Sequence, residues 1–328
     1  MSTARDVSDL YRRAVVVDGM NNARLTGDYL RTVRDAGITV AMLPVSITDT
    51  FAAAVERILA LREVVQANAD VAMIVRTVDD IRTVKSDGRL GLVLALEDSR
   101  QLEKDLRKVQ LFHDLGVRRM QIVYTTLNDA GSGPGDQVDV GLSRFGEQLV
   151  REIERCGVLL DLCHAGPSTL RDAVAVAVKP AIWSHTNSRA VFDHPNNLSD
   201  AELDLVAANG GVVGISGIPF YACGPDGSLD RVLDHVDHVV QRIGIDHVGI
   251  GLAVFENHPL SFYERFSSLP REIYGDPPWA WPAGISTISE FPNIATGLAE
   301  RGYDETQLRA ILGGNHLRLL ETAWETPS

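Results

Sequence analysis

The sequence predicts a single (β/α)8 barrel, and two observations lead to this fold class. Short apolar runs rich in Val, Ile and Leu recur along the whole chain, and helix-like segments lie between them. The runs are too short for helices and too continuously apolar for strands with one wet face, so we interpret them as parallel strands buried on both sides. Eight such strands alternating with helices predict a closed barrel. The runs are AVVVD (14–18), ITVAML (38–43), LGLVLAL (90–96), RMQIVY (119–124), GVLLDL (157–162), PAIWS (180–184), GVVGIS (211–216) and HVGIGL (247–252).

The segments between these runs have the pattern of amphipathic helices. In residues 51–68, the side chains of Val55, Ile58 and Val65 keep mainly to one helical face. Residues 198–211 open with a Ser199 cap and close on glycine, which predicts both ends of one helix. An open, doubly wound sheet is the alternative, but the first run lacks the glycine-rich turn of a dinucleotide site.

The predicted domain covers residues 1–328, and one segment departs from the alternation. Residues 254–292 are rich in proline and aromatic side chains and include two of the four tryptophans. The prolines exclude a long continuous helix. In a barrel this segment would leave the carboxyl-terminal rim, where active sites form, so it predicts a rim loop or cap that walls a pocket. A rigid surface loop or a dimer contact is the alternative.

Composition excludes several classes of protein. With 31 Lys and Arg against 44 Asp and Glu, the net charge is −13, and no basic cluster offsets it, so nucleic-acid binding is not expected. Three cysteines cannot make a disulfide framework in a chain of this length and indicate free thiols. No apolar stretch resembles a signal peptide or a membrane span, so we expect no membrane partner and a cytoplasmic location.

Polar residues at the strand ends suggest a metal site. Glu97 comes directly at the end of the third run, after Leu96, His164 follows the fifth run and His185 follows the sixth. Because the carboxyl ends of barrel strands share one rim, these side chains are expected to converge there. One carboxylate and two imidazoles suit zinc or a similar ion with an open position. Cys163 precedes His164, but adjacent extended residues point apart, so we expect its thiol to pack beside the barrel.

The remaining histidines carry weaker signals. His194 and His258 fall in rim loops, from which either side chain could reach a ligand. Four others lie in predicted helices and are expected on the surface or in packing: His113, His235, His238 and His316. No serine-hydrolase elbow, phosphate-binding loop or paired Cys-x-x-Cys occurs, which disfavours those chemistries.

Several strings along the chain resemble the membrane (renal) dipeptidase family of the amidohydrolase superfamily. They are VVDGMNNAR (16–24), GLSRFGEQLVREIERCGVLLDLCHAG (141–166), AIWSHTNSRAV (181–191), HPNNLSDAEL (194–203), GGVVGIS (210–216), IGIDHVGIG (243–251) and GGNHLRLL (313–320). The resemblance implies a barrel metallopeptidase that forms a homodimer. It also implies that Glu97 is the glutamate that bridges two metal ions, and that His164 and His185 are the histidines of the second ion.

The chain departs from the family pattern at positions that matter for chemistry. The resemblance implies a His-x-Asp pair on the first metal where this chain has Met20 and Asn22. It implies an aspartate at Ala253, an arginine that binds substrate at Asn196, and a histidine that contacts substrate at Tyr124. A thioether and a carboxamide are poor replacements for imidazole and carboxylate on a divalent ion.

These departures predict one divalent ion, with zinc the expected metal, on Glu97, His164 and His185. Without the arginine, a substrate carboxylate loses its bidentate partner, so simple dipeptides are not the expected substrates. A neutral, ring-bearing or amide-capped small molecule fits better. Six residues are expected to contact it: Asn22, Tyr124, His194, Asn196, Trp279 and Trp281.

Three functions remain open. The first is a metal-dependent hydrolase of a small amide or peptide-like molecule, with Glu97 as both ligand and base, or with Glu256 or Asp193 as the base. The second is a non-hydrolytic enzyme, such as a lyase, tautomerase or decarboxylase of a biosynthetic pathway, with Tyr124 as acid or base. The third is a relative that binds a ligand without catalysis. We expect the first.

Overall fold

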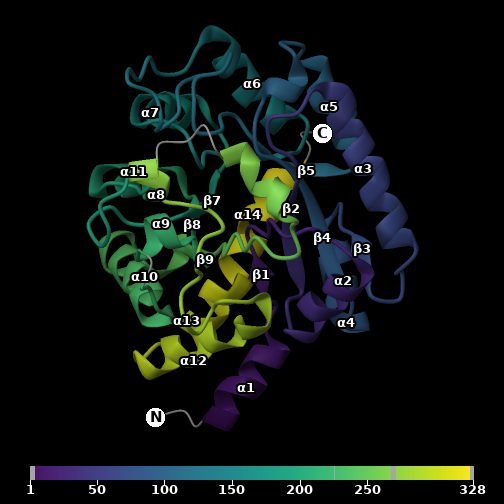
Figure 1. Cartoon of the computed structure of the whole chain (residues 1–328), viewed down its shortest axis with the longest axis vertical. Coiled ribbons are helices and arrows are strands. Elements are labelled where there is room, and N and C mark those ends of the chain that lie inside the picture. The colour runs from purple at the N-terminus through teal and green to yellow at the C-terminus, as the bar shows by residue number, and fades with distance from the viewer. Residues whose placement is uncertain (1–3, 225, 267–270, 326–328) are drawn as a thin grey trace.

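The computed structural model describes residues 4–224, 226–266 and 271–325, and its centre is a nearly closed barrel of parallel strands (Figure 1). The strand order is β1-β2-β4-β5-β6-β7-β8-β9, and β3 pairs with β4 off this path. The single (β/α)8 barrel predicted from the sequence is therefore confirmed. The strands are β1 Val17–Asp18, β2 Val40–Ser46, β3 Ala72–Ile74, β4 Leu90–Leu96, β5 Val117–Gln121, β6 Leu159–Asp161, β7 Ile182–Thr186, β8 Val212–Ile215 and β9 Val248–Ile250.

The ring closes where the segment that begins with β1 runs beside β9. The Gly19 amide donates to the Ile250 carbonyl at 2.8 Å, and the Ala253 amide donates to the Met20 carbonyl at 2.8 Å. The buried Asp18 carboxylate also accepts the Leu252 amide at 3.0 Å. Burial raises the pKa of Asp18 to about 7, and its hydrogen bonds with backbone amides oppose that shift.

Each of the eight apolar runs corresponds to a strand of the ring, with two shifts and one omission. The fourth and sixth runs were placed about two residues from β5 and β7, because charged residues occupy the start of β5 and polar residues occupy the end of β7. The sequence interpretation missed β3, which is three residues long and half-buried at its last two positions. It lies beside the first half of β4, at Leu90–Leu92, and β5 lies beside the second half, at Leu94–Leu96.

Helices surround the ring, and the helix whose two ends were predicted has them. The second predicted helix is α8, in which Ser199 accepts the Glu202 amide and Gly210 takes the left-handed conformation at φ 75°. No helix within the described ranges is long and apolar enough to cross a membrane. The helices are α1 Ala4–Arg13, α2 Gly27–Asp35, α3 Phe51–Gln66, α4 Val78–Asp87, α5 Arg107–Asp114, α6 Arg144–Arg155, α7 Pro167–Val176, α8 Asp200–Asn209, α9 Pro219–Ala222, α10 Leu229–Ile243, α11 Arg271–Tyr274, α12 Pro292–Glu300, α13 Glu305–Arg309 and α14 Asn315–Trp324.

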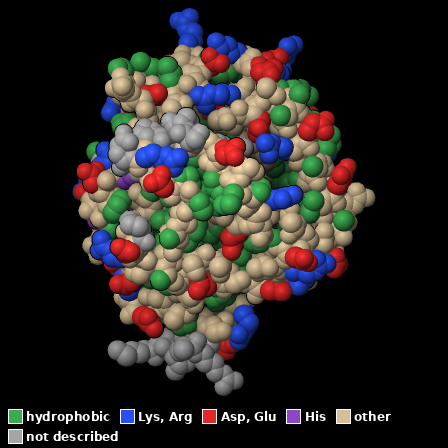
Figure 2. Space-filling model, viewed as in Figure 1, with side chains coloured by type: hydrophobic (Ala, Val, Ile, Leu, Met, Phe, Trp, Pro, Cys, Tyr) green, Lys and Arg blue, Asp and Glu red, His purple; other side chains and the backbone are tan. Residues whose placement is uncertain are grey.

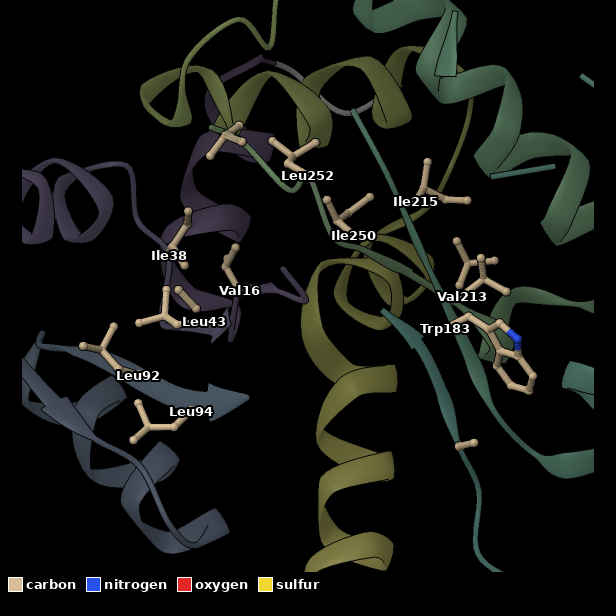
Figure 3. Close-up of a cluster of buried hydrophobic side chains, with 14 of the residues drawn as sticks. Val16, Ile38, Leu43, Leu92, Leu94, Trp183, Val213, Ile215, Ile250 and Leu252 are labelled. Carbon is tan, nitrogen blue, oxygen red and sulfur yellow. The ribbon is translucent and has the colours of Figure 1, made fainter. Parts of the chain in front are cut away.

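Two apolar clusters lie on the two faces of the strands. Successive residues of β4 alternate between them, since Leu92 and Leu94 belong to the larger cluster and Val93 to the smaller. Figure 3 shows part of the larger cluster, in which Val213 and Ile215 of β8 also take part. Strands with both faces buried explain why the runs are continuously apolar instead of alternating.

The last helix, α14, closes the amino-terminal end of the barrel. Its Leu319 and Leu320 join the smaller cluster, and Arg318 donates to the Gly210 and Asp246 carbonyls, which precede β8 and β9. His316, which was expected either on the surface or in packing, is fully buried beneath the strands and therefore has the packing role. The opposite, carboxyl-terminal end is therefore the one left for a functional site.

Close approach of neighbouring strands requires glycine in β8. A Cβ on Gly214 would lie 2.1 Å from the Ser184 carbonyl oxygen of β7. We therefore expect Gly214→Ala to lower the free energy of unfolding by about 1–3 kcal/mol or more, as overpacking does. The measurement is urea denaturation. Leu111→Ala, at an exposed position on α5, is the control and should change stability by about 0.5 kcal/mol or less. Equal stability of the two variants would contradict the close approach.

Candidate active site

Three side chains at the carboxyl-terminal rim meet in one place. Glu97 directly follows β4, His164 follows the end of β6, and His185 lies in β7. The Nε2 atoms of His164 and His185 are 3.0 Å apart, and His185 Nε2 lies 3.6 Å from Glu97 Oε1. The structure thus brings together the three residues that the strand ends singled out. Their role as metal ligands stays a prediction.

The separations suit one ion. Ligand atoms about 2.0–2.1 Å from a tetrahedral zinc ion lie about 3.3 Å from one another. The distances of 3.0 and 3.6 Å between the donor atoms lie on either side of that value. Small side-chain shifts would therefore bring all three groups onto one ion.

The Nδ1 atoms of both histidines, which point away from the shared Nε2 contact, lie within hydrogen-bond distance of neighbouring side chains. His185 Nδ1 lies 2.8 Å from Ser184 Oγ, and His164 Nδ1 lies 3.3 Å from Asn196 Nδ2. The oxygen and nitrogen of an asparagine amide exchange by a half turn, so Asn196 can present either atom to His164. Such partners fix ring orientation and leave Nε2 to face the cavity.

Burial keeps both imidazoles neutral. Desolvation lowers the pKa of His164 to about 3, with a smaller effect from the nearby His194. Desolvation also lowers the pKa of His185 well below its ordinary value, helped by His164 and by the Arg119 guanidinium. A neutral imidazole has a lone pair available for a metal ion.

The position of Cys163 corrects the sequence interpretation. One ligand atom each of Cys163, His164 and His185 lies within 4.8 Å of the others, so the thiol is not beside the barrel. The expectation assumed an extended chain, but His164 has a left-handed backbone at φ 60°, which turns both side chains to the same region. The thiol donates to the His185 carbonyl at 3.2 Å, and burial raises its pKa well above the ordinary range. Since the thiolate is the metal-binding form, Cys163 is a poorer candidate than Glu97.

These groups face a small cavity of about 20 Å³, which has room for one water-sized species. Asn22, Tyr124 and Asn196, all predicted to contact substrate, line it. The Tyr124 ring lies 4.8 Å from the His164 ring, centroid to centroid. The 254–292 segment contributes Phe255, Phe266, Tyr274 and Trp279 to the same wall.

The long insertion lies over the middle of the molecule in Figure 1, where it is drawn in yellow-green. Its residues 267–270 lie outside the described residues. Trp279 packs on Phe220 with 4.8 Å between ring centroids and donates to the Tyr274 carbonyl at 2.6 Å. In the described parts, this segment therefore covers the cavity with aromatic side chains.

Two predicted contact residues lie outside the lining. Trp281 packs against the buried cluster of Met20, Ile218, Tyr221 and Ala253. The His194 ring lies 5.7 Å from the Tyr274 ring, centroid to centroid. Its Nδ1 accepts a hydrogen bond of 3.1 Å from the backbone N–H of Asn196. His194 therefore stands behind the wall and supports Asn196.

The two alternative bases are engaged elsewhere. Glu256 accepts a hydrogen bond of 2.7 Å from the Tyr29 hydroxyl and one of 3.3 Å from the Ile288 amide. Asp193 is exposed and lies 3.9 Å from Arg189. Neither residue lines the cavity. Of the candidate bases, Glu97 is the one that faces it.

Sequence reasoning missed a buried cation beneath the site. Arg119 of β5 is fully buried, and its Nε lies 3.4 Å from Asp161 Oδ2. The guanidinium also donates to the Gly19 carbonyl and lies 3.1 Å from Met20 Sδ. Asp161 Oδ1 accepts the amides of Cys163 at 3.0 Å and Ser184 at 3.3 Å. A charged residue at the start of a mostly apolar run was the available signal, because buried arginines are almost always paired.

Comparison with known proteins gives consistent matches. The family model "Membrane dipeptidase (Peptidase family M19)" matches residues 6–262. A solved amidohydrolase from Pseudomonas aeruginosa is 31% identical, with a TM-score of 0.92 over 97% of this chain and 99% of that one. The dipeptidase tcpJ of Claviceps purpurea is 28% identical over 84% of this chain and 60% of its own length. The dipeptidase aclJ of Aspergillus oryzae is 30% identical over 72% and 52%. The chain thus spans between half and two thirds of these two dipeptidases.

Burial of neutral His164 predicts a pH dependence of the metal-free protein. The pKa is about 3 in the folded state and 6.5 as the ordinary value, so the unfolded chain takes up the proton first as pH falls. The free energy of unfolding should therefore fall between pH 6.5 and 3, by up to about 1.4 kcal/mol per pH unit for this group. Chemical denaturation of wild type and His164→Gln at several pH values checks this. A slope unchanged by the substitution would show that His164 titrates normally.

The buried Arg119–Asp161 pair predicts a large loss on removing one partner. Arg119→Met should lower the free energy of unfolding by about 3–5 kcal/mol, because it leaves the Asp161 carboxylate without its cation. Arg309→Met removes the exposed Arg309–Glu305 pair, with its 2.8 Å contact, and should change stability by about 0.5 kcal/mol or less. Guanidinium denaturation measures both. Equal losses of unfolding free energy in the two variants would mean that the buried pair stabilises the fold no more than the exposed pair does.

Proposed function

Because the chain belongs to the membrane dipeptidase family, peptidase family M19, we propose that it is a metal-dependent hydrolase of a small amide or peptide-like molecule that uses one divalent ion. The observation that carries the proposal is the meeting of Glu97, His164 and His185 in a buried cavity at the barrel rim. Two neutral imidazoles and one carboxylate are the donor set of many catalytic zinc sites.

In this proposal, the three side chains hold the ion and their neighbours orient them. A zinc ion there would supply Lewis acidity toward a substrate carbonyl. Ser184 and Asn196 hold the two imidazole rings through their Nδ1 atoms. Glu97 is both a ligand and the proton acceptor, and Tyr124, whose ring lies beside the His164 ring, is the candidate for a second acid or base.

One ion is proposed because apolar side chains occupy the positions where the family resemblance implies ligands of another ion. Met20 and Ala253 pack together in a buried apolar cluster, where anionic ligands would be needed. The Arg119 guanidinium lies 3.1 Å from Met20 Sδ. A fixed, buried positive charge repels a divalent cation, and in a desolvated site this repulsion is screened little.

A neutral substrate is proposed from the cavity wall. Asn196 faces His164 and the Tyr274 hydroxyl, at 3.3 Å each, and provides no cation for a carboxylate. Phe255, Phe266 and Trp279 provide aromatic surface. Rings of this kind bind flat, partly apolar groups through burial and stacking.

The presence of Tyr124 in the cavity supports a second candidate, a non-hydrolytic enzyme that moves a proton on a small molecule. In that case Tyr124 would be the acid or base and the ion the electrophile. The cytoplasmic location and the homodimer expected from the sequence also remain proposals, and the three free cysteines are consistent with a reducing compartment.

The proposal predicts about one zinc ion per chain after growth with zinc and exhaustive dialysis. Elemental analysis should find that His185→Ala loses it, because two ligands hold an ion poorly. His113→Ala, on α5, is the control and should keep it. Two ions per chain, both lost in Glu97→Ala, would establish a binuclear site instead. A wild-type protein without metal would favour the relative that binds without catalysis.

The missing carboxylate partner predicts a preference between matched substrates. The amide of glycyl-L-phenylalanine should be cleaved about a hundredfold more efficiently than glycyl-L-phenylalanine itself, since burial of an unpaired carboxylate costs about 2–4 kcal/mol. Measurement of kcat/KM with added zinc checks this. Cleavage of free dipeptides with kcat/KM above about 10⁴ M⁻¹s⁻¹ would mean that the carboxylate is recognised by another route.

A further inference from the structure

A larger space lies beside the catalytic cavity, and nothing in the proposed chemistry uses it. It has a volume of about 290 Å³, against about 20 Å³ for the catalytic cavity, and we call it the side chamber. It is bounded by the segment after β1, the end of β2 and helix α3. Its volume is close to the lower limit of small-molecule pockets. The catalytic cavity alone is too small for a substrate, so the rest of the molecule must lie elsewhere.

The side chamber and the catalytic cavity share two lining residues, Asn22 and Ile47. These side chains form the boundary between the two spaces. The Asn22 main chain is fixed on both sides, because its amide donates to the Val254 carbonyl at 3.0 Å and its carbonyl accepts His258 Nε2 at 2.6 Å. A ligand that reaches from one space into the other must therefore pass the Asn22 side chain.

The side-chain oxygen of Asn22 lacks a hydrogen-bond donor among the described residues. The residue is 8% exposed, and its Oδ1 is buried with no hydrogen-bond partner among the described residues. Buried side-chain oxygens almost always have a donor, so an exception at a boundary between two cavities suggests that a ligand supplies it. An amide N–H is the donor expected of an amide substrate.

The walls of the side chamber are mostly apolar. Leu25, Leu43, Leu61 and Val64 line it. Figure 2 shows hydrophobic side chains gathered near the middle of the face that is also seen in Figure 1. The charge of Arg57 is matched by Asp49, with an Nε–Oδ2 distance of 3.1 Å, and the other cation on the lining, Arg24, is exposed to solvent. A charged ligand group would find no unmatched buried partner here, whereas an apolar group would gain by leaving water.

We propose that the side chamber binds an uncharged, apolar branch of the substrate, a short acyl chain or a single ring, and that Asn22 Oδ1 accepts the N–H of the amide that carries it. The inference rests on the proposed function, because it takes the Glu97–His164–His185 cavity as the place of reaction. Binding to the side chamber can be measured without turnover, so its failure and the failure of the proposed function can be told apart.

The experiment measures binding of acetamide, butanamide and hexanamide to the full chain by direct titration calorimetry, with and without zinc. Affinity should rise about fourfold for each buried methylene, in both conditions. Methyl hexanoate lacks an N–H and should bind at least tenfold more weakly than hexanamide in wild type. Asn22→Leu should remove that preference.

Matched variants on α3 locate the bound chain. Leu61→Trp fills the side chamber and should abolish the dependence on chain length. Leu59→Trp, two residues away with a side chain 42% exposed and outside the chamber, should keep it. No gain from acetamide to hexanamide in wild type would overturn the proposal. An equal gain in Leu61→Trp and Leu59→Trp would also overturn it, because the chain would then bind elsewhere.

Discussion

The arrangement of the candidate site depends on one buried ion pair, Arg119 with Asp161. Arg119 reaches from β5 to the Gly19 carbonyl and the Met20 sulfur, so it ties the end of β1 to the opposite part of the barrel. Asp161 in turn accepts the backbone amides of Cys163 and Ser184. Cys163 directly precedes His164, and Ser184 directly precedes His185. The pair therefore fixes the backbone that carries both imidazoles, from below and out of contact with the cavity.

The same ion pair connects stability with the number of metal ions. A buried guanidinium is tolerated only where anions and carbonyl groups meet it, and Asp161 and Gly19 do so here. Its charge stands beside Met20, at the strand end where the family pattern implies a metal ligand. In the proposed one-ion site, this fixed positive charge would disfavour a second ion at the strand end that carries Met20 and Asn22.

The sequence predicted the barrel and the meeting of three rim residues because both follow from periodic burial. Features without a period were not accessible. The left-handed backbone of His164 brought Cys163 toward the site, and no apolar pattern reports such a turn. In the irregular segment after β9, Trp279 lines the cavity while the nearby Trp281 packs below it, and only the folded chain distinguishes them. The burial of Asn22 Oδ1 without a hydrogen-bond donor among the described residues likewise depends on contacts between distant segments.

The central claim is that one ion is held by Glu97, His164 and His185, with no sulfur ligand and no second ion. X-ray absorption at the zinc edge of the zinc-loaded protein tests it most directly. The account predicts nitrogen and oxygen neighbours at about 2.0–2.2 Å, with the scattering pattern of two imidazoles. A sulfur neighbour at about 2.3 Å would place Cys163 on the ion. A metal neighbour at about 3.5–4 Å would show a binuclear centre. Either result would contradict the account.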